Sequence, residues 1–146
     1  MKQEHKKKRN KLLFLCVFFF IANNIVGGVI INIKNNIFLY WKIGKKMFDE
    51  RIYCENIVSK YATYLAYYFG MSSTFSLDNV HYMIKLYLCF PIYYDELNKL
   101  TFEHYRLLVN ISDISKRYFY FRVALFCRSS VAELNNLILN DIYLYM

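Results

Sequence analysis

The chain has 146 residues, of which 57% are hydrophobic and 21% charged, with only 4 Gly and 1 Pro. This length suits one domain with a core of its own, and this composition excludes a disordered chain. The scarcity of glycine and proline argues against a fold of many strands and tight turns, so we expect helices joined by short loops.

The net charge of +8 lies mostly at the N-terminus. Residues 1–11 hold 6 Lys and Arg against 1 Glu, which is +5, and the remaining residues hold 13 against 10, which is +3. A basic balance is typical of proteins that bind nucleic acid or a membrane surface. Here only the terminal segment is strongly basic.

An apolar stretch follows at residues 12–33, interrupted by Asn23 and Asn24. Read as one segment, it has the length of about 20 residues that a bilayer requires. The Lys and Arg residues before it then predict a single pass with a cytoplasmic N-terminus. The alternative is a buried helix, because apolar residues recur at helical spacing from Val26 to Phe48 with polar residues opposite them.

These features predict two parts: residues 1–33, a basic tail with a hydrophobic segment, and residues 34–146, a helical domain. The expected location is the cytoplasm, and the alternative is the membrane, through residues 12–33.

Hydrophobic periodicity and capping residues predict an all-α fold, a compact bundle of about six helices. The expected helices are 26–50, 56–69, 76 to about 90, 102–109, 113 to about 127, and one from 130 onward. In the third of these, the residues expected to face the core are Val80, Met83, Ile84 and Tyr87.

The stretch from Asn56 to Leu88 has the order of a helix-turn-helix unit. Gly70 is expected to end its first helix in a left-handed conformation, and Ser76 is expected to cap the second. Helix-turn-helix units place their second helix against DNA, so this order favours a nucleic-acid function.

No residue pattern indicates catalysis, a metal or a cofactor. Cys16, Cys54, Cys89 and Cys127 are far apart, have no His at metal-ligand spacing and lie in apolar runs, so we expect buried, reduced thiols. No Asp, Cys or Ser motif accompanies His104, so we expect it to make structural hydrogen bonds. The sequence therefore predicts a protein that is not an enzyme.

Several motifs together resemble a known family. They are Tyr40-Trp41-Lys42-Ile43-Gly44, Phe75-Ser76 with Asn79 and Met83, Tyr87 with Phe90-Pro91, the run from Leu100 to Leu108, and Val131 with Glu133-Leu134. In order and spacing they resemble the N-terminal domain of the YhcG-type family of PD-(D/E)XK nucleases, over about residues 34–146. The resemblance implies a helical DNA-binding module that precedes a nuclease domain. No Glu-x-Lys metal-site strand of such a nuclease follows residue 110.

The chain departs from the family pattern at three arginine positions, which are occupied by Asp78, Ile84 and Ala132. Because arginine supplies many phosphate contacts, these departures weaken the inference of DNA binding. The matching residues are those expected to form the scaffold: Trp41, Gly44, Phe75, Ser76, Tyr105, Leu107 and Leu134.

The candidate DNA contacts are basic and polar residues of the expected helices: Lys45, Lys46, Asn79, His81, Lys85, Lys116, Arg117 and Arg122. Lysine and arginine are expected to bind phosphates, with Asn79 and His81 facing the groove. We therefore predict a non-catalytic helical module that binds DNA. The alternatives are a protein-interaction module for a separately encoded nuclease or another subunit, a membrane-anchored small protein, and a truncated relic of a nuclease.

Overall fold

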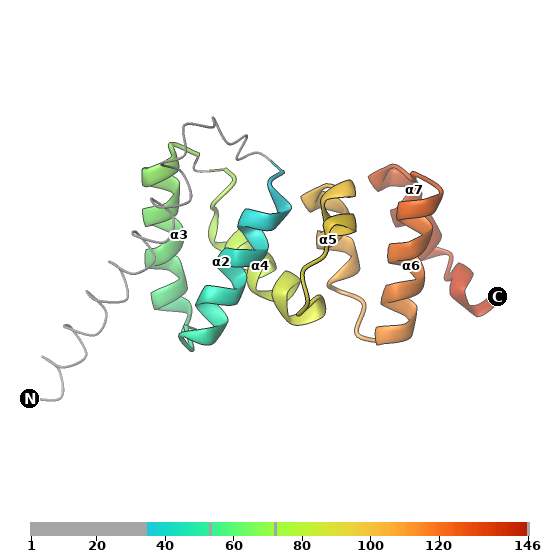
Figure 1. The fold of residues 1–146 in the computed structure, drawn as a ribbon, viewed down its shortest axis with the longest axis horizontal. Coiled ribbons are helices and arrows are strands. Elements are labelled where there is room, and N and C mark those ends of the chain that lie inside the picture. The colour runs from blue at the N-terminus through green and yellow to red at the C-terminus, as the bar shows by residue number, and fades with distance from the viewer. Residues whose placement is uncertain (1–34, 53, 72, 146) are drawn as a thin grey trace, which may run out of the picture. The chain divides into compact units, whose positions relative to one another are not determined.

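A computed structural model describes residues 35–52, 54–71 and 73–145, as helices joined by short connections (Figure 1). The helices are α2 (Ile37–Asp49), α3 (Glu55–Phe69), α4 (Leu77–Cys89), α5 (Phe102–Leu108), α6 (Ile114–Phe126) and α7 (Val131–Leu139), with short 3-10 helices η1 (Asp95–Lys99) and η2 (Ile142–Tyr145). These ranges contain no strand, which confirms the prediction of an all-α fold with about six helices.

The first described helix begins later than predicted. The side chain of Asn36 accepts a hydrogen bond from the backbone N–H of Leu39 at 2.9 Å, and Asn35 has a left-handed φ of 62°. An asparagine in this role caps a helix and starts it. The prediction of one continuous helix from Val26 to Glu50 is therefore wrong, because Asn35 and Asn36 are not helical and α2 begins after them. Residues 26–34 lie outside the described residues.

α2 and α4 approach each other closely at Gly44. A Cβ atom at this position would lie 1.9 Å from the carbonyl oxygen of Met83, so no larger residue fits without moving a backbone. Nearby, the indole N–H of Trp41 donates to the carbonyl oxygen of Phe90 at 2.7 Å, just beyond the last residue of α4. These contacts hold α2 along α4, side by side in Figure 1.

The helix-turn-helix order of the sequence is present in α3 and α4. α3 ends at Gly70, which has a φ of 63°, and the side chain of Ser76 caps α4 by accepting from the N–H of Asn79. Both caps are confirmed. The connection from Gly70 to Ser76 is longer than the turn of about three to four residues in a typical helix-turn-helix unit.

The buried side of α4 is broader than predicted. Val80, Met83 and Ile84 are buried as expected, but Leu86 is also fully buried, while Tyr87 is only half-buried. α4 contacts both α2 and α3, so it buries two adjacent faces and not a single stripe. Tyr87 lies at the edge of this surface, with its ring centroid 5.4 Å from that of Trp41.

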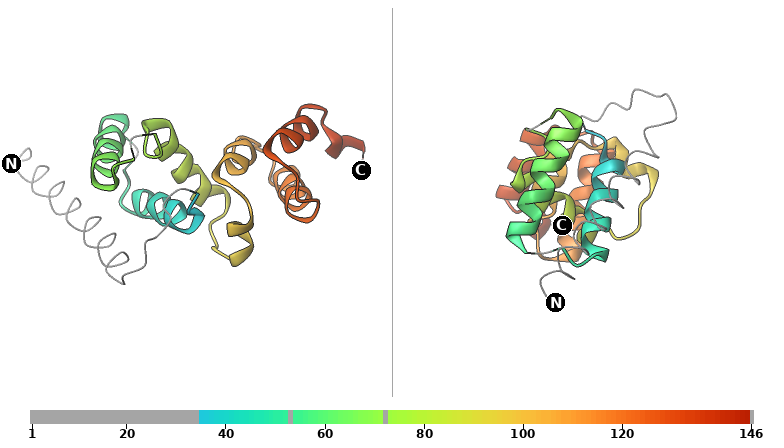
Figure 2. Two further views of the ribbon diagram at one scale, coloured as in Figure 1. Left: turned by 90° about the horizontal axis from the view of Figure 1, so that it is seen from above. Right: turned by 90° about the vertical axis from the view of Figure 1, so that its left-hand side faces the viewer.

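Capping interactions define the helices of the C-terminal part, where α6 and α7 lie side by side (Figure 2). Asp113 caps α6, and Ser130 forms a capping box with Glu133 at the start of α7. Two hydrogen bonds from Ser130 hold the pKa of the Glu133 carboxyl below its usual value. Both caps stand at the helix starts that the sequence predicted, residues 113 and 130.

His104 has the structural role expected of it. Its Nδ1 atom accepts from the backbone N–H of Thr101 at 3.2 Å, and its Nε2 atom lies 2.9 Å from the carbonyl oxygen of Ser129. The buried His104 ring thereby joins the start of α5 to the connection between α6 and α7.

The prediction of buried cysteines is wrong at two positions. Cys54 precedes α3 and Cys127 follows α6, and both are exposed because residues at helix ends face solvent here. Cys89 is half-buried, and burial raises the pKa of its thiol. These three thiols are free, and Cys16 lies outside the described residues.

None of the helices in the described part is long and apolar enough to cross a membrane. The hydrophobic segment predicted at residues 12–33 lies outside that part. Residues from Lys34 to Met146 group into one contact unit, which contains all the helices described above.

Candidate nucleic-acid interface

A cluster of charged and aromatic side chains joins α4 to α5. We call it the α4–α5 cluster; it consists of Asp78, His81, Tyr82 and Lys85 from α4 and Arg106 from α5. These residues line a shallow pocket of about 300 Å³. On α4 they follow helical spacing, which places them together on its solvent-facing side.

The phenol ring of Tyr82 is in contact with two cations. The Lys85 ammonium lies 5.3 Å and the Arg106 guanidinium 4.9 Å from the ring centroid, within the range of cation–π attraction. Asn110 supports this arrangement, since its side-chain amide donates to the carbonyl oxygen of Arg106 at 3.0 Å and lies 3.4 Å from the Tyr82 hydroxyl.

Neither cation of the cluster is closely neutralised. The nearest polar contact of the Lys85 ammonium is the Asn110 side-chain oxygen at 3.5 Å, and Arg106 reaches Glu103 only at 3.4 Å, in an exposed pair within one helix. Exposed pairs of this kind contribute little because water and salt screen them. Both charges are therefore available to an anion.

Asp78 opposes anion binding at the same pocket. It lies in the first turn of α4, where a carboxylate interacts favourably with the positive end of the helix dipole. Its negative charge repels a phosphate placed between Lys85 and Arg106. The cluster therefore combines two available cations with one opposing anion.

Asn79 is engaged in the turn before α4. Its side-chain amide nitrogen donates to the carbonyl oxygen of Ser73 at 2.9 Å, while its backbone N–H donates to Ser76. The side chain expected to face a DNA groove thus stabilises the connection between α3 and α4.

The lysines at the end of α2 are paired with carboxylates. Lys45 bonds to Asp49 at 2.5 Å and Lys46 to Glu50 at 2.7 Å, each one turn further along the helix. The hydrogen bond to Asp49 raises the pKa of the Lys45 ammonium. Within residues 45–50 the two pairs offset the charges of both lysines.

The three basic residues predicted on α6 do not share a surface. Lys116 bonds to Asp141 at 2.6 Å, and Arg117 is buried, donating to the carbonyl oxygen of Ile111 at 2.7 Å. Arg122 is exposed, with its guanidinium 5.8 Å from the centre of the Phe126 ring. Burial removes Arg117 from the phosphate contacts that the sequence suggested, because a buried side chain cannot reach a bound phosphate.

The eight predicted contacts therefore separate into paired, buried and available groups. Of them, His81 and Lys85 belong to the α4–α5 cluster. Tyr82 neighbours these two residues on the polar side of the predicted helix, whereas Arg106 was not predicted as a contact. Arg106 stands in a segment that resembles the family, but only the packing of α5 beside α4 brings it to Tyr82.

The residues expected to form the scaffold lie mainly in the core. Trp41, Gly44, Phe75, Tyr105 and Leu134 are buried, and Ser76 is the cap of α4. Tyr105 donates its hydroxyl to the carbonyl oxygen of Leu97 at 2.7 Å, and burial raises the pKa of this phenol. Leu107 is only half-buried. Of the two leucines at the end of α5, Leu108 is the one that lies in the core.

In the described ranges, His, Cys, Asp and Glu side chains form no group of three or more that could hold a metal ion.

Comparison with known proteins gives one match. A family model described as the DUF1016 N-terminal domain matches residues 29–144, which is most of the chain. No curated protein and no solved structure matches the chain.

Proposed function

The chain belongs to the DUF1016 N-terminal domain family, the N-terminal domain of the YhcG-type proteins, and on this premise we propose that it is a non-catalytic helical module that binds DNA. The proposed contact surface is the α4–α5 cluster. The proposal rests on two available cations, Lys85 of α4 and Arg106 of α5, which both lie against the ring of Tyr82.

The chemistry of the cluster suits a phosphate backbone. Lysine and arginine are the main phosphate-binding side chains, and the cation–π contacts and Asn110 limit the freedom of both here. Less side-chain entropy is then lost on binding. In this arrangement Lys85 and Arg106 bind neighbouring phosphates, while His81 stands beside them on the solvent side of α4.

The cations that are paired with carboxylates are expected to add little, and the exposed Arg122 lies apart from the cluster, on α6. The ammonium groups of Lys45, Lys46 and Lys116 must leave their carboxylate partners, or share them, before they can bind phosphates. With two strong contacts and one opposing carboxylate, we expect weak binding with little sequence preference, since most of the free energy comes from phosphates.

The test is the salt dependence of binding by the full chain. Fluorescence anisotropy with a labelled duplex is measured at several salt concentrations between about 50 and 200 mM, for the wild type and for Lys85→Ala and Arg106→Ala. Each substitution removes one phosphate contact, so each is expected to reduce the slope of log Kd against log salt by about 0.9.

Lys99→Ala is the matched control, because Lys99 is an exposed lysine of η1 outside the cluster. It removes the same charge and is expected to change the slope less. The basic residues 1–11 contribute contacts of their own, so the comparison among variants carries the test. Absence of binding at low salt, or equal slopes for all three variants, contradicts the proposal.

A further inference from the structure

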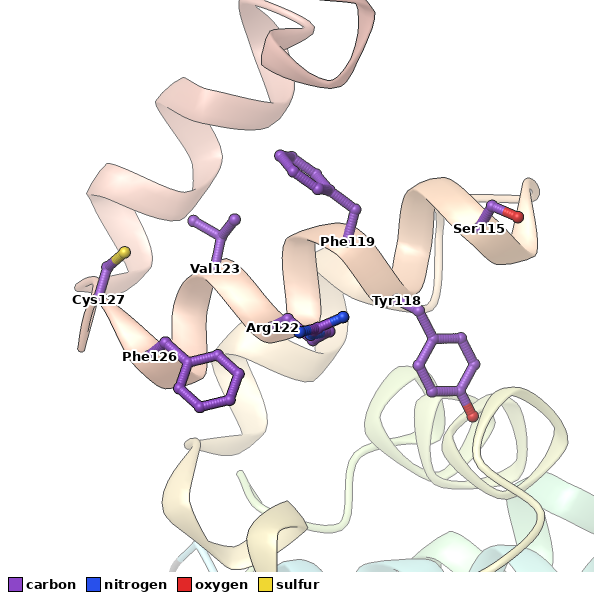
Figure 3. Close-up of a pocket in the computed structure, with 7 residues that line it drawn as sticks. All are labelled: Ser115, Tyr118, Phe119, Arg122, Val123, Phe126 and Cys127. Atoms are coloured by element: carbon purple, nitrogen blue, oxygen red, sulfur yellow. The ribbon is translucent and has the colours of Figure 1, made fainter. Parts of the chain in front are cut away.

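α6 presents aromatic side chains to solvent on the side that does not face the core. We call this surface the α6 face. It lines a shallow pocket of about 500 Å³ (Figure 3). The lining residues are Ser115, Tyr118, Phe119, Arg122, Val123, Phe126 and Cys127.

Two of these aromatic side chains are exposed to solvent. Phe126 is 73% exposed and Tyr118 is 37% exposed, whereas Tyr120, Phe121 and Ala124 on the opposite side of α6 are buried. Tyr118, Arg122 and Phe126 are each one turn apart, so they form a continuous row along the helix (Figure 3). The row therefore joins two exposed aromatic rings with a cation between them.

One cation lies in the middle of this apolar row. The Arg122 guanidinium lies over the ring of Phe126, and no carboxylate of the described residues forms an ion pair with it. The other basic residues of α6 add no second available charge, since Lys116 is paired and Arg117 is buried, and the exposed Arg128 follows the helix and does not line the pocket. The α6 face therefore complements a surface that is apolar and carries one negative charge.

We propose that the α6 face docks an amphipathic helix of a partner protein, one whose apolar side carries a carboxylate that pairs with Arg122. The row from Ser115 to Cys127 extends over about 18 Å, at 1.5 Å per residue, which matches about three turns of a partner helix. Apolar residues at i, i+4 and i+7 of that helix contact Phe126, Val123 and Phe119. The carboxylate of the partner helix lies between these apolar residues, opposite the Arg122 guanidinium.

Charge disfavours two other occupants. A second copy of this chain in a two-fold pair of α6 helices places one Arg122 against the other, and like charges repel. Nucleic acid requires several cations along its backbone, and on this face only Arg122 is available among the described residues.

The experiment uses the full chain and a pair of labelled helical peptides of about 15 residues. Both carry leucine at i, i+4, i+7 and i+11 of one side; one has a glutamate beside the central leucines and the other a lysine at the same position. Fluorescence anisotropy is expected to show about tenfold tighter binding of the glutamate peptide. Arg122→Glu is expected to reverse this preference. Phe126→Ala is expected to weaken the binding of the glutamate peptide by about tenfold.

Both substituted side chains are exposed, so the variants are expected to fold, which thermal melting checks. Lys60→Glu is the matched control: it reverses an exposed charge on α3, outside the α6 face, and leaves the peptide preference unchanged.

Three results overturn the proposal. The first is equal affinity for the two peptides, or no binding of the glutamate peptide at about 1 mM. The second is a dimer in sedimentation that Phe126→Ala abolishes, which assigns the face to a second copy. The third is tighter binding of a single-stranded oligonucleotide than of the peptide, lost in Arg122→Glu, which assigns the face to nucleic acid.

Discussion

At the scale of single residues, the partner of each basic side chain decides what that side chain contributes. Lys45 and Lys116 have carboxylates at hydrogen-bonding distance, and these bonds raise the pKa of both ammonium groups. Lys85 and Arg106 instead lie against an aromatic ring. A phosphate competes with a close carboxylate in the first case, and in the second only with water at Lys85 and with the longer, exposed contact to Glu103 at Arg106, so residues of the same type differ in their value for DNA binding.

Asp78 provides the residue-scale prediction. Asp78→Arg replaces an opposing charge with a favourable one at the pocket of the α4–α5 cluster. At about 8 Å in water, two units of charge change a phosphate interaction by about 1 kcal/mol, so we expect about fivefold tighter duplex binding at low salt, measured by anisotropy.

The control for this prediction is Asp95→Arg, which makes the same charge change in η1 at an exposed position outside the cluster. It is expected to increase affinity less. Equal gains from both substitutions would indicate that net charge alone drives binding and that the cluster has no special role.

At the scale of helices, the close contact of α2 with α4 depends on one glycine. Gly44→Ala places a Cβ atom against the carbonyl oxygen of Met83, which is backbone and cannot rotate away. The helices must separate, and we expect a loss of about 3 kcal/mol in the free energy of unfolding, measured with denaturant.

Gly70→Ala is the matched comparison for the Gly44 prediction. No atom lies within 4 Å of a Cβ at Gly70, but its φ of 63° disfavours an L residue. This backbone strain is expected to cost only about 1 kcal/mol. A loss for Gly44→Ala no larger than that for Gly70→Ala would contradict the role given to the helix contact.

The helix ends show where local sequence signals apply. Ser76, Asp113 and Ser130 each accept a hydrogen bond from a backbone N–H three residues later, as their residue types predicted. At Asn36 the same chemistry contradicted the apolar periodicity, which runs on without a break. Periodicity reports which residues face the core, but it does not report where the backbone hydrogen bonds begin.

At the scale of the whole molecule, the basic charge is divided between the N-terminal tail and the helical domain. Residues 1–11 carry +5, while the domain is nearly balanced. We expect a variant with glutamine at Lys2, Lys6, Lys7, Lys8, Arg9 and Lys11 to bind duplex DNA more weakly and with a shallower salt slope.

The effect of Lys85→Ala is expected to persist in this tail variant. Distant, independent contacts contribute additively. Lys85→Ala should therefore raise Kd by the same factor in the tail variant as in the wild type, within about twofold. A Lys85→Ala effect that disappears without the tail would contradict separate contributions from tail and cluster.

The all-α class, the family and most helix ends could be predicted from the amino-acid sequence alone. These depend on local properties: the spacing of apolar residues, capping side chains a few positions from their partners, and motifs such as the one containing Trp41 and Gly44. Burial of Trp41, Phe75 and Leu134 also followed, because large apolar side chains in an amphipathic pattern have one energetically favourable side.

Which charges are available depends on how the helices pack against one another. The burial of Arg117, the pairing of Lys116 with Asp141 and the meeting of Arg106 with Tyr82 all join residues from different parts of the chain. Spacing along one helix cannot predict such contacts, because they depend on how the helices pack. The same packing leaves the Phe126 side chain exposed beside Arg122, although Phe126 stands in the same aromatic-rich segment as the buried Tyr120 and Phe121.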